Sequence, residues 1–180
     1  MSKRSVCGAV VLLVYLAGVG LLTGPSLYQL LAGSLPQPRL SLVPFADIAA
    51  VLRDPNAPGL GVAANLAGNA ALLAPLGFLL PLFWQWFARA GRTVGFCFGI
   101  SLSIELIQLV AGGVTSADDL LLNTLGAAIG YGAACMLLLL APRLAPRRTG
   151  RAEWLVPLGC WVAVIAGCTL SDLAFMGGIS

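Results

Sequence analysis

The sequence predicts an all-α membrane protein, built as a bundle of about five transmembrane helices in one domain that spans residues 1–180. Composition is the first observation behind this prediction: 59% of the residues are hydrophobic and 9% are charged, whereas a soluble domain carries about 25% charged residues. The second is that the apolar residues gather in stretches of about 20, the length that crosses a bilayer. The third is that basic residues favour alternate loops. A surface with so few charges must face lipid.

The predicted spans, in order, are Val6–Leu31, Ala64–Phe87, Thr93–Val110, Leu120–Leu140 and Trp154–Leu173. The first is interrupted by Gly24 and Pro25, so we expect its membrane part to end near Leu22. Lys3 and Arg4 before an apolar run also resemble a signal peptide, but no clear small-residue cleavage site follows, which favours a retained helix.

Basic residues predict the orientation of these spans. Arg39 and Arg53 fall on one side of the predicted membrane, and the other eight fall on the opposite side: Lys3, Arg4, Arg89, Arg92, Arg143, Arg147, Arg148 and Arg151. Because basic loops stay in the cytoplasm, the N-terminus is predicted inside and the C-terminus outside. The long loop of residues 32–63 and the turn of residues 111–118 then face outward.

Several classes of function are disfavoured by composition. The chain has no histidine, which removes histidine catalysis and most zinc or haem sites, and its net charge of +3 is too scattered to indicate nucleic acid. Its five cysteines form no C-x-x-C pair and lie in apolar stretches, as inert buried thiols do: Cys7, Cys97, Cys135, Cys160 and Cys168. We therefore expect no metal and no cofactor.

Polar side chains within the apolar spans are the candidate binding site, because such groups are costly in lipid. They come in pairs at helical spacing, one pair at the outward end of each of three spans: Asn65 and Asn69, Glu105 and Gln108, Asp119 and Asn123. The predicted topology brings all three pairs to a similar depth. We expect them to form one polar pocket open to the outside, with Glu105 hydrogen-bonded to one of the asparagines.

Some of these residues also have purely structural interpretations. Ser116-x-x-Asp119 matches a helix capping box, and Asp118 would then be an exposed charge favoured by the helix dipole. Gly126 and Gly130 form a small-residue seam that predicts close helix packing, and the preceding span carries a similar seam of Gly95, Gly99 and Ser103.

Three motifs, in order, resemble the VanZ-like family of bacterial membrane proteins. Residues 65–78 read NLAGNAALLAPLGF, residues 103–108 read SIELIQ, and residues 118–130 read DDLLLNTLGAAIG. With Pro44 and Phe45, the resemblance covers residues 44–131 and leaves the predicted span at 154–173 as an addition. This chain has Leu73 where the family has Phe, and it lacks the Arg and the aromatic residue that relatives carry before the Asp pair.

The resemblance implies a multi-pass protein of the bacterial cytoplasmic membrane, of a type linked to teicoplanin-type glycopeptide resistance. Its partners would be the lipid bilayer and a lipid head group, a lipid-linked wall precursor or a lipoglycopeptide antibiotic. One alternative is a membrane-embedded enzyme that uses Glu105 and Asp119 as general base and acid. Another is a proton- or ion-coupled transporter. The lack of histidine, of a serine nucleophile motif and of a metal cluster favours a binding protein.

Overall fold

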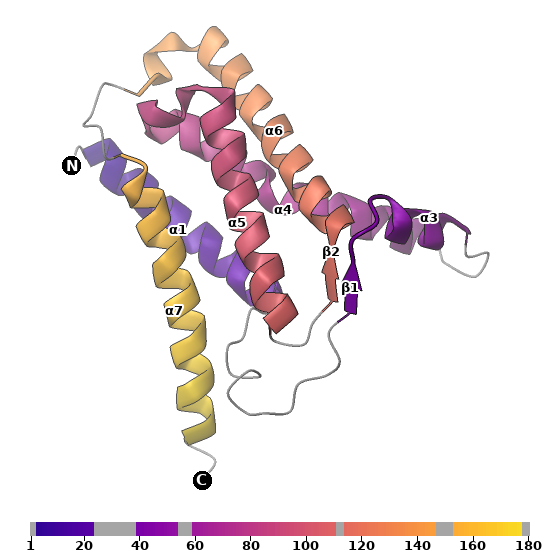
Figure 1. Ribbon diagram of the computed structural model, residues 1–180. Helices are drawn as coiled ribbons and strands as arrows, with labels where there is room; N and C mark the ends of the chain where they lie inside the picture. The colour runs from indigo at the N-terminus through magenta and orange to yellow at the C-terminus, as the bar shows by residue number, and fades with distance from the viewer. Residues whose placement is uncertain (1–2, 24–38, 54–58, 111–113, 147–152, 178–180) are drawn as a thin grey trace.

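The computed structural model describes residues 3–23, 39–53, 59–110, 114–146 and 153–177, and it is an all-α bundle, as predicted (Figure 1). The long helices are α1 (Lys3–Thr23), α4 (Gly59–Phe83), α5 (Ala90–Val110), α6 (Ala117–Leu140) and α7 (Leu155–Gly177). The short elements are β1 (Arg39–Ser41), α3 (Ala46–Arg53), η1 (Gln85–Ala88), β2 (Val114–Ser116) and η2 (Pro142–Leu144).

Each predicted span overlaps one of the long helices, and residues 24–31 of the first predicted span lie outside the described residues. Three of these helices hold stretches long and apolar enough to cross a membrane, Leu66–Phe83, Ala90–Leu109 and Ala117–Leu140. In α1 and α7 the described apolar stretches are shorter, Arg4–Gly20 and Leu155–Gly167. The chain is thus a membrane protein by the length and composition of its helices.

The most extensive helix contact joins α4 and α6, and glycines make it possible. A Cβ atom added at Gly126 would lie 1.7 Å from the carbonyl oxygen of Ala70, and one added at Gly130 would lie 1.9 Å from that of Ala74. The two contacts advance together along both helices, so α4 and α6 run parallel. The close packing predicted for Gly126 and Gly130 is confirmed.

The second predicted seam behaves differently. A Cβ atom at Gly95 or Gly99 would meet nothing within 4 Å, so the prediction of close packing there is wrong for the described residues. Ser103 of that seam does contact another helix, because its hydroxyl accepts a hydrogen bond of 3.0 Å from the indole nitrogen of Trp161 on α7. Small residues permit close approach but do not create it, and α7 packs mainly on α1.

A two-stranded parallel sheet, not predicted from the sequence, joins the chain before α3 to the chain before α6. Leu40 of β1 pairs with Thr115 of β2, and Ser41 pairs with Ser116. Strands of three residues are too short to show an alternating pattern, which is why the sequence did not reveal them.

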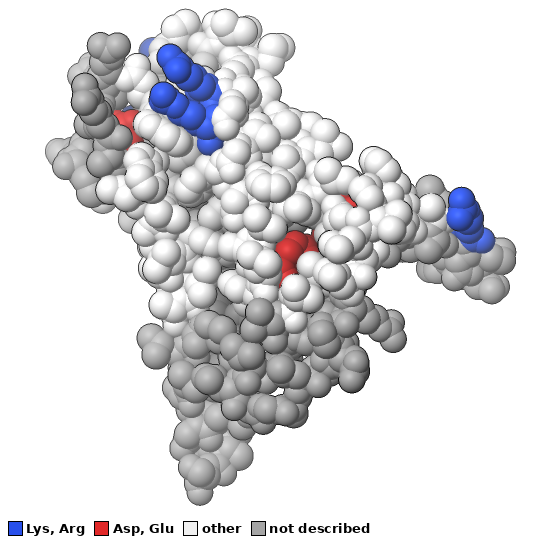
Figure 2. Space-filling model, viewed as in Figure 1, with Lys and Arg blue, Asp and Glu red and all other residues white. Residues whose placement is uncertain are grey.

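The two ends of the bundle differ in charge. At one end, Arg4 donates hydrogen bonds to carbonyl oxygens of Leu82, Leu144 and Ala145 and so ties α1 to the ends of α4 and η2. Arg92 stacks over the ring of Trp86 at 4.9 Å at the same end, which we call the arginine end. The start of α6, with Asp118 and Asp119, lies at the other end, which we call the aspartate end. In Figure 2, basic side chains gather at one end and a separate basic side chain lies on α3.

Candidate functional site

The start of α6 organises the aspartate end. Ser116 is the N-cap of α6, and its hydroxyl accepts a hydrogen bond of 3.1 Å from the amide of Asp118. The amide of Ser116 itself donates to Oε2 of Glu105 on α5 at 3.0 Å. The hydroxyl of Thr115 donates to the carbonyl oxygen of Glu105 at 3.1 Å. Glu105, which is 4% exposed, therefore holds the first residues of α6 against α5.

One pair of side chains links α4 to α6 at this level. The side-chain amide of Asn69 donates a hydrogen bond to Oδ1 of Asp119, and both residues are half-buried. The carboxylate of Asp119 also lies close enough to Glu105 to interact with it electrostatically. Asn69, Glu105 and Asp119 thus come together from three helices, and we call them the acidic cluster.

A second polar layer lies one helical turn further into the bundle. The side-chain amide of Asn123 donates to the hydroxyl of Ser101 at 3.0 Å. Asn123 is 3% exposed, and its Oδ1 has no hydrogen-bond partner in the described part of the chain. An amide oxygen left without a donor costs free energy, about 1–3 kcal/mol. Behind the acidic cluster the bundle therefore holds a spare hydrogen-bond acceptor.

Asp118 differs from its prediction. It was expected to be exposed, but it is 2% exposed, and its carboxylate accepts hydrogen bonds from the amides of Phe45 and Ile48, the latter at 3.1 Å. These amides belong to the N-terminus of α3, where helices leave donors unsatisfied. Asp118 is a cap supplied by another helix. It fixes Phe45 in a backbone conformation with φ of 65°, which a bulky residue adopts only when its surroundings hold it there.

The six residues predicted to form the site have separate outcomes. The structure brings Asn69, Glu105 and Asp119 together and places Asn123 one turn behind them. Gln108 is half-buried, three residues beyond Glu105. Asn65 belongs to α4, but its side chain lies outside the described residues.

Among the described residues, Glu105 accepts a hydrogen bond from the backbone amide of Ser116, whereas Asn69 donates to Asp119 and Asn123 donates to Ser101. The Ser116 amide is the partner that side-chain spacing could not identify. Among the described residues, no group of three or more His, Cys, Asp or Glu side chains is arranged to hold a metal ion. Acidic atoms are visible at the surface near the foot of α5 and α6 in Figure 2.

Comparison with known families decides the membership of the chain. The family model described as VanZ/LLP1 matches residues 9–140, well over half of the sequence. The chain belongs to the VanZ/LLP1 family. The match runs from α1 to the end of α6, so it includes the whole acidic cluster and ends before α7. The comparison with curated proteins found no match, and neither did the comparison with solved structures.

Proposed function

We propose that this VanZ/LLP1 protein is a multi-pass protein of the bacterial cytoplasmic membrane that binds the polar head group of an envelope lipid at its acidic cluster. The same site would accept the head group of a lipid-linked wall precursor or a lipoglycopeptide antibiotic of the teicoplanin type. The proposal includes five spans, with the N-terminus and the arginine end in the cytoplasm and the aspartate end outside. Its support is the excess of basic residues in alternate loops.

The hydrogen bond between Asn69 and Asp119 is the observation that carries this proposal. Both side chains are half-buried, so they are held in place and remain within reach of a ligand. Carboxylate oxygens accept hydrogen bonds from hydroxyl and ammonium groups, and the amide both donates and accepts. Sugars, amines and peptide stems carry these groups. Polar side chains at the end of an apolar bundle are costly to maintain without such a use.

A binding measurement tests this proposal directly. The protein would be purified in lipid nanodiscs, and its affinity for teicoplanin and for a lipid-linked wall precursor would be measured for wild type, Asn69→Ala and Glu105→Gln. We expect both variants to bind more weakly. Thr124→Ala is the matched control, because among the described residues the Thr124 hydroxyl donates its hydrogen bond to the carbonyl oxygen of Leu120 in its own helix. Equal binding by all four proteins would refute a head-group site at the acidic cluster.

The two carboxylates of the cluster favour one alternative function. Glu105 and Asp119 come from different helices and lie close enough to interact electrostatically, an arrangement in which one carboxyl group serves as base and the other as acid. The protein would then be an enzyme that modifies an envelope lipid or precursor. Mass spectrometry of lipids and wall fragments from a deletion strain distinguishes the two functions. Loss of an enzyme leaves its substrate unmodified, so the modified product disappears. Loss of a binding protein leaves every species chemically unchanged.

A further inference from the structure

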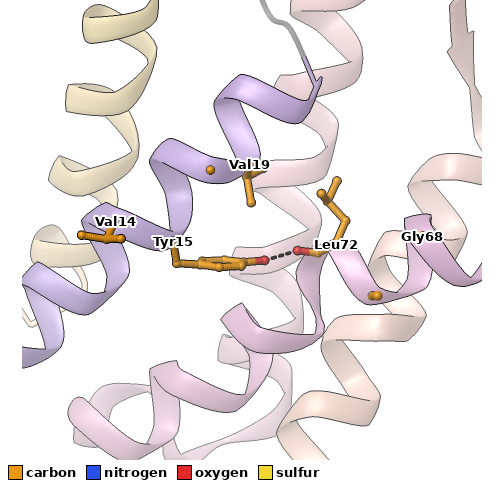
Figure 3. A pocket seen from close by; sticks show the side chains of 7 residues that line it. Val14, Tyr15, Val19, Gly68 and Leu72 are labelled. Atoms are coloured by element: carbon orange, nitrogen blue, oxygen red, sulfur yellow. Dashed lines mark hydrogen bonds between the residues drawn. The ribbon is translucent and has the colours of Figure 1, made fainter.

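The chain that leads from β1 into α3 carries an exposed apolar patch. Four of its side chains are more than half exposed: Leu40, Leu42, Val43 and Phe45. Such exposure is that of an apolar helix surface. Val14, which lines an apolar pocket between α1 and α4 (Figure 3), is 70% exposed, and Val43 is 67% exposed. A patch of this kind marks a surface that something apolar covers.

The pairing of β1 with β2 sets the depth of this patch. Ser41 pairs with Ser116, directly before α6. The hydroxyl of Thr115 donates to the carbonyl oxygen of Glu105, so β2 lies level with Glu105 on α5. The apolar stretch of α5 continues for four more residues, to Leu109, which is about 6 Å of helix. The strands therefore lie beside the apolar part of α5, as Figure 1 shows, and not beyond its end.

The direction of the chain takes the patch further into the bundle. β1 is parallel to β2, and β2 leads into α6, whose apolar stretch Ala117–Leu140 runs from the aspartate end toward the arginine end. The amide of Phe45 then donates to the carboxylate of Asp118, which places Phe45 level with the first turn of α6. The exposed apolar side chains thus lie at a depth that apolar stretches of α5 and α6 both cover.

The backbone of this segment is suited to a surrounding without water. In lipid, irregular backbone is stable only where its polar groups are paired within the protein. The carbonyl oxygen of Val43 accepts from the amide of Ala46 at 3.1 Å, and that of Phe45 accepts from the amide of Ala49 at 2.9 Å. Pro44 has no amide hydrogen to satisfy, and the buried Asp118 accepts from the amide of Phe45.

We propose that residues 40–45 form a re-entrant segment whose side chains insert among the acyl chains of the lipid leaflet at the aspartate end. Depth decides for lipid as the occupant, because Leu106 on α5 and Leu121 on α6 are also exposed at this level and belong to apolar stretches that cross the membrane. The inference goes beyond the proposed function and holds whichever side of the membrane that leaflet faces. It replaces the water-facing loop predicted for this part of the chain.

Thiol labelling tests the depth of the segment. The variants would be placed in nanodiscs of phosphatidylethanolamine and phosphatidylglycerol and treated with a charged maleimide, which reacts with the thiolate that forms in water. We expect Leu42→Cys and Val43→Cys to stay at the background set by the cysteines of the wild type. Leu125→Cys is the matched control in the apolar stretch of α6, where Leu125 is exposed, and it should also stay at background.

Arg143→Cys is the control for contact with water, because Arg143 is exposed and lies beyond the apolar stretch of α6. It should be labelled completely in the same time. Labelling of Leu42→Cys and Val43→Cys as fast as that of Arg143→Cys would overturn the proposal.

Photo-crosslinking distinguishes lipid from a second copy of the chain. Benzoylphenylalanine in place of Val43 bonds to the nearest C–H group on irradiation, and the mass of the product identifies its partner. We expect a phospholipid adduct, with a yield like that from the same probe in place of Leu125. The probe in place of Arg143 should give little of this adduct. A covalent dimer from position 43 would overturn the proposal, because it would show that a second copy covers the patch.

Discussion

Single glycines decide how closely α4 and α6 approach, and this gives the first prediction. Gly126→Leu should destabilise the fold, because even the Cβ atom would lie 1.7 Å from the carbonyl oxygen of Ala70 and that backbone cannot move aside locally. Overpacking a well-fitted core costs about 1–3 kcal/mol, and a clash with a helix backbone should reach the upper end. Thermal melting of the detergent-solubilised protein measures the loss.

Gly132→Leu is the matched control on the same helix, because a Cβ atom there meets nothing within 4 Å. It should melt like wild type. A Gly126→Leu protein with the same melting temperature as this control would show that the α4–α6 contact is looser than its glycines require.

Glu105 has two roles that its substitutions separate. Glu105→Ala removes the acceptor of the Ser116 amide and leaves a buried donor unpaired, at a cost of about 1–3 kcal/mol. We expect Glu105→Ala to insert into the membrane, to have a lower melting temperature than wild type and to lose its activity, the binding of the ligand. Glu105→Gln keeps an acceptor oxygen, so it should melt close to wild type while binding its ligand more weakly. If both variants bind the ligand more weakly but only Glu105→Ala has a lower melting temperature, the two roles are separate. Equal melting temperatures for the two variants would contradict this.

A capping contact was predictable where its partner is local in sequence. Ser116 was predicted as a helix cap from the residues that follow it, and it is one. Asp118 was predicted as an exposed charge, yet it caps a helix about 70 residues away. The position of Asp118 in the sequence does not indicate that contact, because the contact depends on how α3 packs against α6.

At the scale of elements, α3 depends on a cap from another helix, and this gives the third prediction. Asp118→Ala should loosen α3, because the amides of Phe45 and Ile48 lose their shared acceptor. Loss of a helix cap costs about 0.5–2 kcal/mol. Limited digestion with trypsin reports the change, since Arg53 at the end of α3 is exposed and an unfolded helix is cut faster there.

Asp118→Asn keeps one acceptor oxygen, so its digestion rate should lie between those of wild type and Asp118→Ala. Identical rates for all three proteins would mean that the short helix is stable without its cap. Tryptic sites at the arginine end give an internal reference, because they should be cut at the same rate in all three proteins.

The long helices were predictable as elements because each contains a long apolar stretch, although those described in α1 and α7 are shorter than the other three. β1 and β2 were not, since three residues carry no periodic pattern and their pairing joins segments far apart in the chain. The seam of Gly126 and Gly130 was correctly assigned to packing, whereas Gly95 and Gly99 were not. The same residue types can line a helix contact or face lipid, and only the arrangement of the helices distinguishes these cases.

Across the whole molecule, the ends of the bundle are held together in different ways. At the arginine end, Arg4 donates to carbonyl oxygens that helix ends leave unsatisfied. At the aspartate end, Glu105 and Asp118 accept from amides at the starts of α6 and α3. Cations thus meet helix C-termini and carboxylates meet helix N-termini, as the helix dipole favours. Basic side chains thus gather at the arginine end, where the buried Glu153 also accepts a hydrogen bond from the amide of Trp86.

The basic residues of the arginine end lead to the last prediction, which concerns the orientation of the molecule in the membrane. Basic residues near span ends stay in the cytoplasm, so the arginine end should face inward. Reporter fusions after Gly91 and after Thr149 should both score as cytoplasmic, and a fusion at Ser180 should score as external. The fusions carry the same reporter and are compared at equal expression. A reporter at Ser180 that scores as cytoplasmic would mean that the first or the last predicted span does not cross the membrane. A reporter after Gly91 that scores as external would mean that the molecule has the opposite orientation. The acidic cluster would then face the cytoplasm, which would refute binding of a wall precursor from outside.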